Sequence, residues 1–418
     1  VLEHHSDVVI DNELLNEKYE RLIENWDEVP IIATTAVQFF NTLFKEKKQN
    51  LRRFHSLCNS IIIFDEVQAL PVKVMGMFHL AINFLTEIGG SDVVLCTATQ
   101  PPFEELAENR MLSTEWMTQR LSVYEPKFRR VEYHDCTENG KRTLSVEEAA
   151  KFAAEIAEKS TQLLIVFNTK GAAKQVFDAL RDRTETSLYF LSTDMCAEHR
   201  RDKLAEIEDA LESKERIICV STQLVEAGVD FSFQSVIRSM AGLDNLIQCA
   251  GRCNRHGNRD GITGNVYLIR MNSEAENLNS LYEIRQAQNA LEKILRVYHD
   301  TPDFLDGRLD SEKAIACYYR EYYYGKDAEE RYPVSVEHVQ TDLIELLSGN
   351  SKFTSKKQNL YLKQAFQTAG QKFSLIENKH GIDVIVPYKD ALKFADDYLK
   401  ASDSISKKGY FEKCRDLL

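Results

Sequence analysis

The sequence lacks the long apolar run that a membrane span requires. No stretch of the 418 residues approaches about 18 uninterrupted apolar side chains. The first residues, VLEHHSDVVIDNE, carry acids and histidines where a secretory signal would carry basic residues and an apolar segment. These two absences predict a cytoplasmic protein with no membrane association.

Paired cysteines of the kind found in zinc ribbons are also absent. The nine cysteines are odd in number, scattered, and never spaced C-x-x-C, which predicts reduced thiols in a cytosolic protein. Cys249, Cys253 and His256 are the closest set of candidate metal ligands. A structural zinc site needs four ligands and no fourth lies nearby, so helix packing is the favoured interpretation.

Excess positive charge is the third feature that the sequence lacks. It has 52 basic and 65 acidic residues and a net charge of -13. This balance argues against a protein that holds nucleic acid by bulk attraction, although it leaves a groove-binding motor possible. Short basic clusters are typical of solvated helix faces. They occur at Lys45 to Lys48, Arg52-Arg53, Arg129-Arg130 and Arg200-Arg201.

Up to about residue 270, short apolar runs alternate with amphipathic helical segments. This alternation predicts an α/β fold with a parallel sheet covered by helices on both faces. Helical spacing is clear in Ala36 to Lys47, Gly171 to Arg181 and Ala197 to Leu211. The expected strands are Pro30 to Ala33, Ser60 to Phe64, Val93 to Cys96, Leu163 to Phe167, Ser187 to Leu191, Ile217 to Val220, Ser235 to Arg238 and Asn265 to Ile269.

The pattern divides the chain into four expected parts. A break near residues 101–130 separates two α/β domains, at 1–125 and 126–271. After residue 270 the periodicity is almost purely helical, which predicts a helical linker over 272–340. A mostly helical partial domain is expected at 341–418, with one β-like run at Gly381 to Pro387.

Two strands of the first domain end in polar residues. IIIFDEVQAL places Asp65 and Glu66 after an apolar strand, at the sheet edge where ligands bind in open α/β folds. Asp65 is suited to hold a hydrated Mg²⁺ ion and Glu66 to activate a water, although such acids alone are typical of a solvated turn. VVLCTATQPP ends the next strand in Thr97 and Thr99, small hydroxyl residues beside the acids.

A third motif lies in the second domain, in VSTQLVEAGVDFSFQSVIRSMAGLDNLIQCAGRCNRHG. Gln248, Arg252 and Arg255 are spaced i, i+4 and i+7, and a helix capped by Asp244 would place them on one face. An amide and two guanidinium groups there are suited to grip phosphate oxygens. An arginine stripe alone is usually solvated. Upstream, Ser221 and Thr222 are candidate contacts to a sugar-phosphate backbone, and Gly228 with Asp230 would form a turn toward the nucleotide.

These motifs, in this order, resemble those of superfamily 2 helicases. DEVQ resembles motif II, TAT motif III, STQLVEAGVD motif V and QCAGRCNR motif VI. Together with TTAVQFFNTLF, VFNTKGAAKQVF and LKQAFQTAGQKFSLIE, they resemble the CRISPR-associated type I helicase-nuclease recruited by the Cascade surveillance complex. The resemblance implies two RecA-like domains in tandem, the first incomplete, that use ATP and Mg²⁺ to move along single-stranded DNA.

The resemblance also implies roles for individual residues. Asp65 and Glu66 would handle magnesium and water, and Gly228 with Asp230 would face the nucleotide. Gln248, Arg252 and Arg255 would act on the phosphates. Coupling between nucleotide and DNA would fall to Gln68, Thr97 and Thr99, and contacts to the single strand to Thr34, Thr35, Ser221 and Thr222.

Three departures from the family pattern accompany the resemblance. Gln68 stands where many superfamily 2 members carry histidine, and an amide can still donate and accept. The phosphate-binding pattern G-x-x-x-x-G-K-[ST] does not occur in the 418 residues. The dipeptides His134-Asp135 and His299-Asp300 are isolated from further ligands, so the family's HD nuclease is not expected here. With Val1 in place of methionine, these features predict a fragment inactive alone.

Two other functions fit the same sequence. The chain could be a non-catalytic module that binds Cascade or single-stranded DNA, or an RNA helicase of the DEAD/DEAH type. Affinity of the isolated chain for its partners would distinguish the first alternative. Comparison of stimulation by DNA and by RNA would distinguish the second.

Overall fold

A computed structural model describes residues 1–5, 13–105, 114–117, 129–226, 228–257, 263–354, 362–376, 386, 388–389 and 391–400. The chain divides into two compact units, which are described separately. The first unit combines Val1–Trp116 with Tyr323–Gly381, and the second combines Met117–Tyr322 with Ile382–Leu418. The four-part division expected from the sequence stays a prediction.

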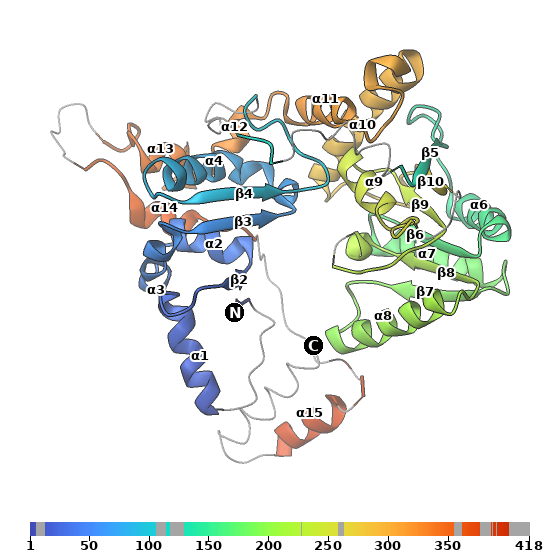
Figure 1. Cartoon of the computed structure of the whole chain (residues 1–418), viewed down its shortest axis with the longest axis horizontal. Helices are drawn as coiled ribbons and strands as arrows, with labels where there is room; N and C mark the ends of the chain where they lie inside the picture. The colour runs from blue at the N-terminus through green and yellow to red at the C-terminus, as the bar shows by residue number, and fades with distance from the viewer. Residues whose placement is uncertain are drawn as a thin grey trace. The chain divides into compact units, whose positions relative to one another are not determined.

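The second unit is built on a six-stranded, fully parallel sheet (Figure 1). Its strand order is β5 (Val131–Asp135), β10 (Gly264–Ile269), β9 (Ser235–Ser239), β6 (Gln162–Val166), β8 (Ile217–Ser221) and β7 (Ser187–Leu191). Every residue of β6, β8 and β9 is buried. Continuous apolar runs are what a parallel sheet covered on both faces requires, and the predicted α/β class is confirmed.

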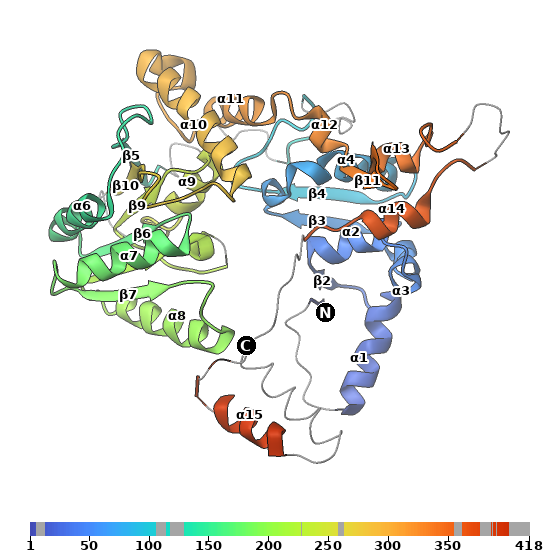
Figure 2. The ribbon, with the colours of Figure 1, turned by 180° about the vertical axis from the view of Figure 1, so that it is seen from behind.

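Helices cover both faces of this sheet. The helices α6 (Val146–Lys159) and α7 (Lys170–Arg181) pack on one face, which is nearer the viewer in Figure 2. Ser145 and Glu148 form a capping box at the start of α6, as the pattern S-x-x-E favours. The helix α9 (Leu243–Ala250) contacts β9, and α8 (Ala197–Glu212) contacts β7 and β8. The resulting core consists mostly of aliphatic side chains from α6, α7 and the central strands.

The first unit contains two separate two-stranded parallel pairs. These are β1 (Leu2–His4) with β2 (Ile32–Thr34), and β3 (Ile61–Asp65) with β4 (Asp92–Cys96). Every strand predicted between residues 30 and 269 is present within two residues at each end. The helices of this part are α1 (Glu13–Asn25), α2 (Ala36–Phe44), α3 (Lys48–Arg52) and α4 (Val72–Glu87).

An aromatic cluster forms the core of the first unit. The Phe64 ring of β3 lies edge-on to Phe39 and Phe78, with ring centres 4.8 and 5.1 Å away. Phe373, far along the chain, packs against Phe40 at 6.1 Å and against Tyr332 at 5.6 Å. Edge-to-face and offset packing of this kind favours close aromatic contact. The cluster explains why residues 323–381 join the first unit.

The region after residue 270 contains an antiparallel hairpin that the helical pattern did not predict. The strands β11 (Pro333–Val336) and β12 (Val339–Asp342) are joined by Glu337 and His338, both with positive φ. Turns with two positive φ angles are usually signalled by Asn-Gly or Asp-Gly, so Glu-His gave no signal. The helices in this region of the sequence are α10 (Tyr282–Asp300), α11 (Glu312–Tyr323), α12 (Asp327–Glu330), α13 (Leu343–Leu347), α14 (Phe366–Lys372) and α15 (Ala391–Lys400). The run Gly381 to Pro387 falls, except for Val386, outside the described residues.

A buried carboxyl group lies where α12 packs on α4. Glu330 is 3% exposed, and its Oε2 atom has no hydrogen-bond partner among the described residues. A Cβ atom at Gly76 of α4 would come within 2.5 Å of the Glu330 main-chain oxygen, so only glycine permits this approach. Burial, with the nearby carboxylates of Asp327 and Glu329, raises the pKa of Glu330 to about 7.

The raised pKa predicts that stability falls as the pH rises. Between about pH 4.5 and 7 the folded protein holds a proton that the unfolded chain has lost. We expect Glu330→Gln to raise the free energy of unfolding at pH 8 by about 1–3 kcal/mol and to leave it unchanged at pH 4. Chemical denaturation at both pH values measures this, with the exposed Glu337→Gln as control. Equal effects at both pH values would contradict it.

Candidate functional site

The carboxyl end of β3 presents two acids in a constrained turn. Asp65 is the last residue of the strand, is exposed, and accepts a hydrogen bond from the Glu66 main-chain nitrogen at 3.1 Å. Glu66 has a φ of 53° in the left-handed region. A non-glycine residue in that region costs about 1 kcal/mol, and such strain is concentrated at functional sites. The role of the two acids in handling magnesium and water stays a prediction.

Gln68 connects the acidic turn to the end of the neighbouring strand. Its side chain donates to the Glu66 carboxylate and accepts from the Thr97 hydroxyl. The register of β3 and β4 pairs Asp65 with Cys96, and this pairing places Thr97 beside the acids. Thr99, fully buried, donates its main-chain N–H to the Thr97 hydroxyl at 3.0 Å. The amide therefore makes, within the first unit, a donor and an acceptor contact at once.

The two threonines predicted to contact DNA in the first unit make hydrogen bonds to nearby main-chain atoms. The Thr34 hydroxyl donates to the His4 carbonyl at 2.8 Å. The Thr35 hydroxyl caps α2 by accepting from the Gln38 N–H at 3.4 Å. Both residues are exposed, so the role in binding a single strand stays a prediction.

In the second unit, the residues directly after β8 are buried, and those a few positions later are exposed. Ser221 and Thr222 are buried, and their hydroxyls have no hydrogen-bond partner among the described residues. Gly228 has a φ of 76° with open space around its Cα, and Asp230 is exposed. A contact between DNA and the two hydroxyls stays a prediction, and it requires these buried hydroxyls to become exposed.

The structure corrects the predicted helix of the arginine motif. The helix α9 is capped by Gly242, with Asp244 inside its first turn, and it ends at Ala250. Gln248 lies on α9, but Arg252 and Arg255 follow in non-helical turns. The three side chains therefore do not share one helical face. After Ala250 the chain continues in turns, and Cys253 forms an isolated parallel bridge with Phe233, which precedes β9.

The two arginines have different environments. Arg252 is 8% exposed and donates to the main-chain carbonyls of Val225 at 2.9 Å and Glu226 at 2.6 Å. Arg255 is partly exposed and pairs with Asp230 at 2.6 Å. Ion pairs at exposed positions contribute little stability, so an anionic ligand can displace Asp230 at low cost. Arg252 thus holds the turn after β8, and Arg255 is the more accessible of the two arginines. The predicted action of both on phosphates stays a prediction.

Sequence reasoning missed a buried polar network beneath this turn. Glu226 and Arg238 form an ion pair at 2.8 Å, and both side chains are almost completely buried. Burial raises the pKa of the Glu226 carboxyl, and the Arg238 guanidinium opposes this effect. The available signal was the arginine in SVIRSM, because a charge inside a central parallel strand needs a buried partner.

A second buried bond anchors the start of α9. The Tyr318 hydroxyl of α11 donates to Asp244 at 2.9 Å. Burial raises the pKa of Asp244, and the bond from Tyr318 opposes the shift. Asp244 thus serves packing between α9 and α11 rather than the helix cap expected from the sequence.

The two His-Asp dipeptides meet in a structural contact. His299 at the end of α10 lies 3.0 Å from Asp135 at the end of β5. The Asp135 carboxylate also accepts from the Thr137 hydroxyl at 2.6 Å and from the Asn139 N–H at 3.1 Å. Burial would raise the pKa of Asp135, but these hydrogen bonds outweigh it and lower the pKa. The Asp135 carboxylate thus has its hydrogen bonds supplied by neighbouring protein groups, as in a structural contact.

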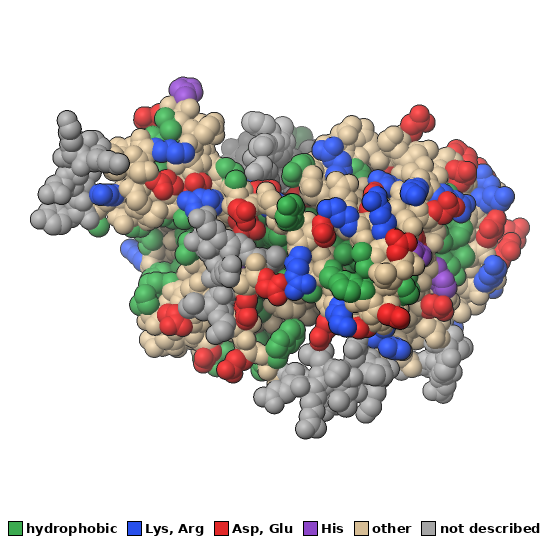
Figure 3. Space-filling model, turned by 90° about the horizontal axis from the view of Figure 1, so that it is seen from above, with side chains coloured by type: hydrophobic (Ala, Val, Ile, Leu, Met, Phe, Trp, Pro, Cys, Tyr) green, Lys and Arg blue, Asp and Glu red, His purple; other side chains and the backbone are tan. Residues whose placement is uncertain are grey.

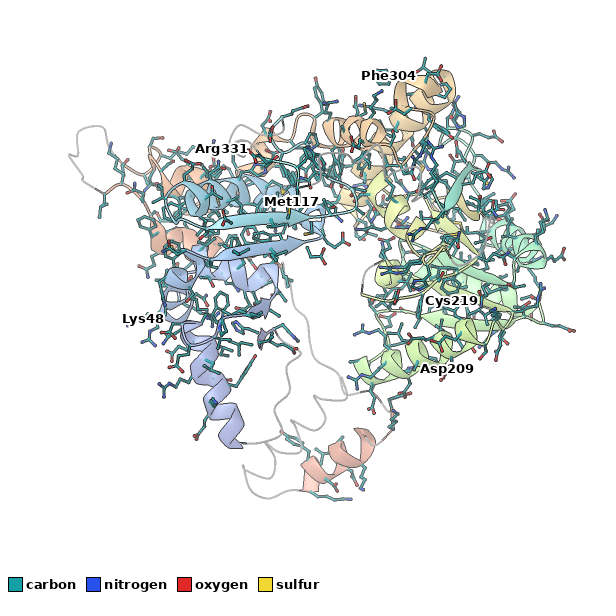
Figure 4. The ribbon with its side chains drawn as sticks, viewed as in Figure 1. Lys48, Met117, Asp209, Cys219, Phe304 and Arg331 are labelled. Carbon is teal, nitrogen blue, oxygen red and sulfur yellow. The ribbon has the colours of Figure 1, made fainter. Side chains whose placement is uncertain are left out.

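Metal binding by clustered side chains is not found in the described part of the chain. There, no group of three or more His, Cys, Asp or Glu residues is placed to hold an ion. Cys249 and Cys253 are buried, and their thiols contact Glu226 and the Gln234 carbonyl. Cys219, labelled in Figure 4, is buried in β8, and burial raises its pKa to about 12. Magnesium in nucleotide sites needs only one or two carboxylates plus substrate phosphates, so Asp65 fits that ion.

Surface charge is mixed. On the face shown in Figure 3, Lys and Arg side chains are interspersed with Asp and Glu, and the described residues there form no broad basic patch. In the described residues, no helix is both long and apolar enough to cross a bilayer.

Several known proteins are similar to this chain in sequence. A family model described as the C-terminal region of the CRISPR-associated nuclease/helicase Cas3 matches residues 159–258. The Cas3 nuclease/helicase of Methanothermobacter thermautotrophicus is 22% identical over 362 residues, covering 85% of this chain and 40% of the relative. That of Haloferax volcanii is 50% identical over 56 residues, 13% of this chain and 6% of the relative.

Solved structures agree with these matches. The crystal structure of T. fusca Cas3 superposes with a TM-score of 0.55 and 18% identity, over 78% of this chain and 43% of that one. Its ATP complex gives a TM-score of 0.52 and 18% identity, over 71% and 38%. The chain spans less than half the length of each of these relatives.

The parallel sheet covered by helices agrees with the RecA-like fold of the helicase domains in these Cas3 structures. The chain is thus similar in sequence and in fold to Cas3 nuclease/helicases.

Proposed function

We propose that this chain is the motor part of an ATP-driven translocase that moves along single-stranded DNA in CRISPR type I interference. The observation that carries the proposal is the link from Glu66 through Gln68 to Thr97. This link joins a candidate water-activating carboxylate to the end of the next strand. A change at the acidic turn can therefore alter the position of the TAT segment.

The proposed chemistry assigns one task to each accessible group. Asp65 would hold magnesium through water, and the ion would neutralise charge on the transferring phosphate. Glu66 would orient and deprotonate the attacking water. Arg255 would leave Asp230 to contact the terminal phosphate, since a guanidinium binds phosphate with two parallel hydrogen bonds.

The proposal also covers the cellular setting. The protein would act in the cytoplasm on DNA delivered by the Cascade surveillance complex. The relative seen in the CRISPR RNA-guided surveillance complex, pre-nicking, supports this partner with a TM-score of 0.50 and 16% identity. Residues 1–418 contain no phosphate-binding loop pattern, so we expect them to hydrolyse no ATP without one.

ATP hydrolysis by the complete protein that the gene encodes tests this function. We expect single-stranded DNA to stimulate hydrolysis and RNA of the same sequence to have little effect. Stimulation by RNA alone would indicate an RNA helicase. Binding of DNA or Cascade without any hydrolysis would indicate a non-catalytic module.

The Gln68 link makes a separate prediction. We expect Gln68→Leu to lower the DNA-stimulated rate by about tenfold, because leucine can neither donate to Glu66 nor accept from Thr97. Gln68→His should retain most of the activity, since an imidazole has one donor and one acceptor. Steady-state rates with and without DNA measure both variants. Equal rates for the leucine and histidine variants would show that the link has no part in catalysis.

A further inference from the structure

Glu226 occupies a point where two hydrogen-bonding systems meet in the second unit. Its carboxylate lies 2.8 Å from the Arg238 guanidinium and accepts from the Asn245 amide at 3.0 Å. Its main-chain carbonyl accepts from Arg252 at 2.6 Å. One residue therefore connects the buried interior to the arginine turn.

Arg238 extends the network beneath three neighbouring strands. It donates to the Asn168 side chain at 2.8 Å and to the Ser239 carbonyl at 2.6 Å. Asn168 in turn contacts Glu276 through its main-chain N–H at 2.6 Å and its amide at 3.0 Å. The Gln223 amide donates to the Asn168 carbonyl at 3.2 Å.

The location of the network indicates its purpose. Asn168, Gln223 and Ser239 lie at or just beyond the carboxyl ends of β6, β8 and β9, which are adjacent in the sheet. Ligands bind at this edge in parallel α/β sheets. A buried ion pair is weak evidence for stability, because an apolar pair of similar volume often serves the fold as well. Retention of buried charges at this edge is better explained by control of geometry.

We propose that Glu226 is a positioning residue for ATP hydrolysis. Its carboxylate is held by the ion pair with Arg238, and this fixes its own main-chain carbonyl, which accepts a hydrogen bond from Arg252. The position of Arg252 then affects the rate of hydrolysis. This inference rests on the function proposed above. Through Arg252 the network holds the carbonyls of Val225 and Glu226, and Asp230, the partner of Arg255, follows a few residues later in the chain. The network contacts the arginine turn through main-chain carbonyls, so we expect it to affect the rate constant more than the Michaelis constant for ATP.

The test compares an isosteric and an apolar replacement in the complete protein. We expect Glu226→Gln to lower kcat for DNA-stimulated ATP hydrolysis by about tenfold and to change KM for ATP by less than about twofold. The double variant Glu226→Leu/Arg238→Met should keep its melting temperature and lose kcat by a larger factor. The exposed Glu208→Gln on α8 serves as the control and should match the unaltered protein.

A second measurement does not depend on activity. Backbone amides of residues 222–226 should exchange with deuterium about tenfold faster in the double variant, while those of α7 stay unchanged. Unchanged kcat in Glu226→Gln, or unchanged exchange at residues 222–226, would overturn the proposal. Should the unaltered protein show no DNA-stimulated hydrolysis, the function fails, and the exchange data still decide whether Glu226 positions the turn. Should the double variant unfold, the proposal is tested with Glu226→Gln alone, through its kcat and the deuterium exchange of residues 222–226.

Discussion

Replacing Glu66 with glutamine is expected to reduce DNA-stimulated ATP hydrolysis by about 10²–10⁴-fold while nucleotide binding persists. Glutamine has nearly the same shape, so the left-handed turn can form as before. The amide cannot accept a proton from the attacking water, which is the step assigned to Glu66. The Gln68 amide can still donate to the new side-chain oxygen, so the link to Thr97 is retained.

The measurement compares steady-state hydrolysis with binding of a fluorescent, non-hydrolysable ATP analogue. Glu87→Gln, at the exposed end of α4, is the matched control and should behave like the unaltered protein. Undiminished hydrolysis in the Glu66 variant would remove this residue from the proposed mechanism. Loss of analogue binding would instead assign Glu66 to the nucleotide site itself.

The largest expected effect on stability comes from Arg238→Met. The change leaves the Glu226 carboxylate buried without its cation, and breaking a buried pair in this way costs about 3–5 kcal/mol. It also removes the donors to Asn168 and to the Ser239 carbonyl. We therefore expect the second unit to unfold at a clearly lower denaturant concentration than in the unaltered protein.

Exchange of buried amides in β6, β8 and β9 during denaturation measures this loss in the second unit alone. Arg183→Met is the matched control, because it deletes an exposed guanidinium after α7. Pairing Arg238→Met with Glu226→Leu should restore most of the lost stability, since no uncompensated charge remains. Equal stability of the single and double variants would show that the unpaired Glu226 carboxylate is not the cause of the loss.

The sequence predicted the strands because a continuous apolar run indicates a strand that is buried on both faces. The runs at β6, β8 and β9 are apolar and fully buried, and a parallel sheet covered on both faces requires this pattern. It also placed Asp65, Glu66 and Thr97 correctly at neighbouring strand ends, because parallel strands end at one edge. Local sequence patterns are sufficient to predict the position of a strand and the residues at its end, because these depend only on that strand and its neighbour.

Helix boundaries and turns were predicted less well. The i, i+4, i+7 spacing of Gln248, Arg252 and Arg255 suggested one helix, but α9 ends at Ala250. The hairpin at β11 and β12 was missed because its turn residues, Glu337 and His338, lack the usual signal. In both places the local sequence permits more than one backbone path.

By itself, the sequence determined the α/β class and the order of the motifs, because both follow from apolar patterns and residue spacings within short segments. Only the tertiary structure decided what each polar side chain does. It buried Arg252 against the carbonyls of Val225 and Glu226 and left Arg255 partly exposed. The physical reason is that burial and hydrogen-bond partners come from residues far apart in the chain, such as Glu226 with Arg238 and Asn168 with Glu276.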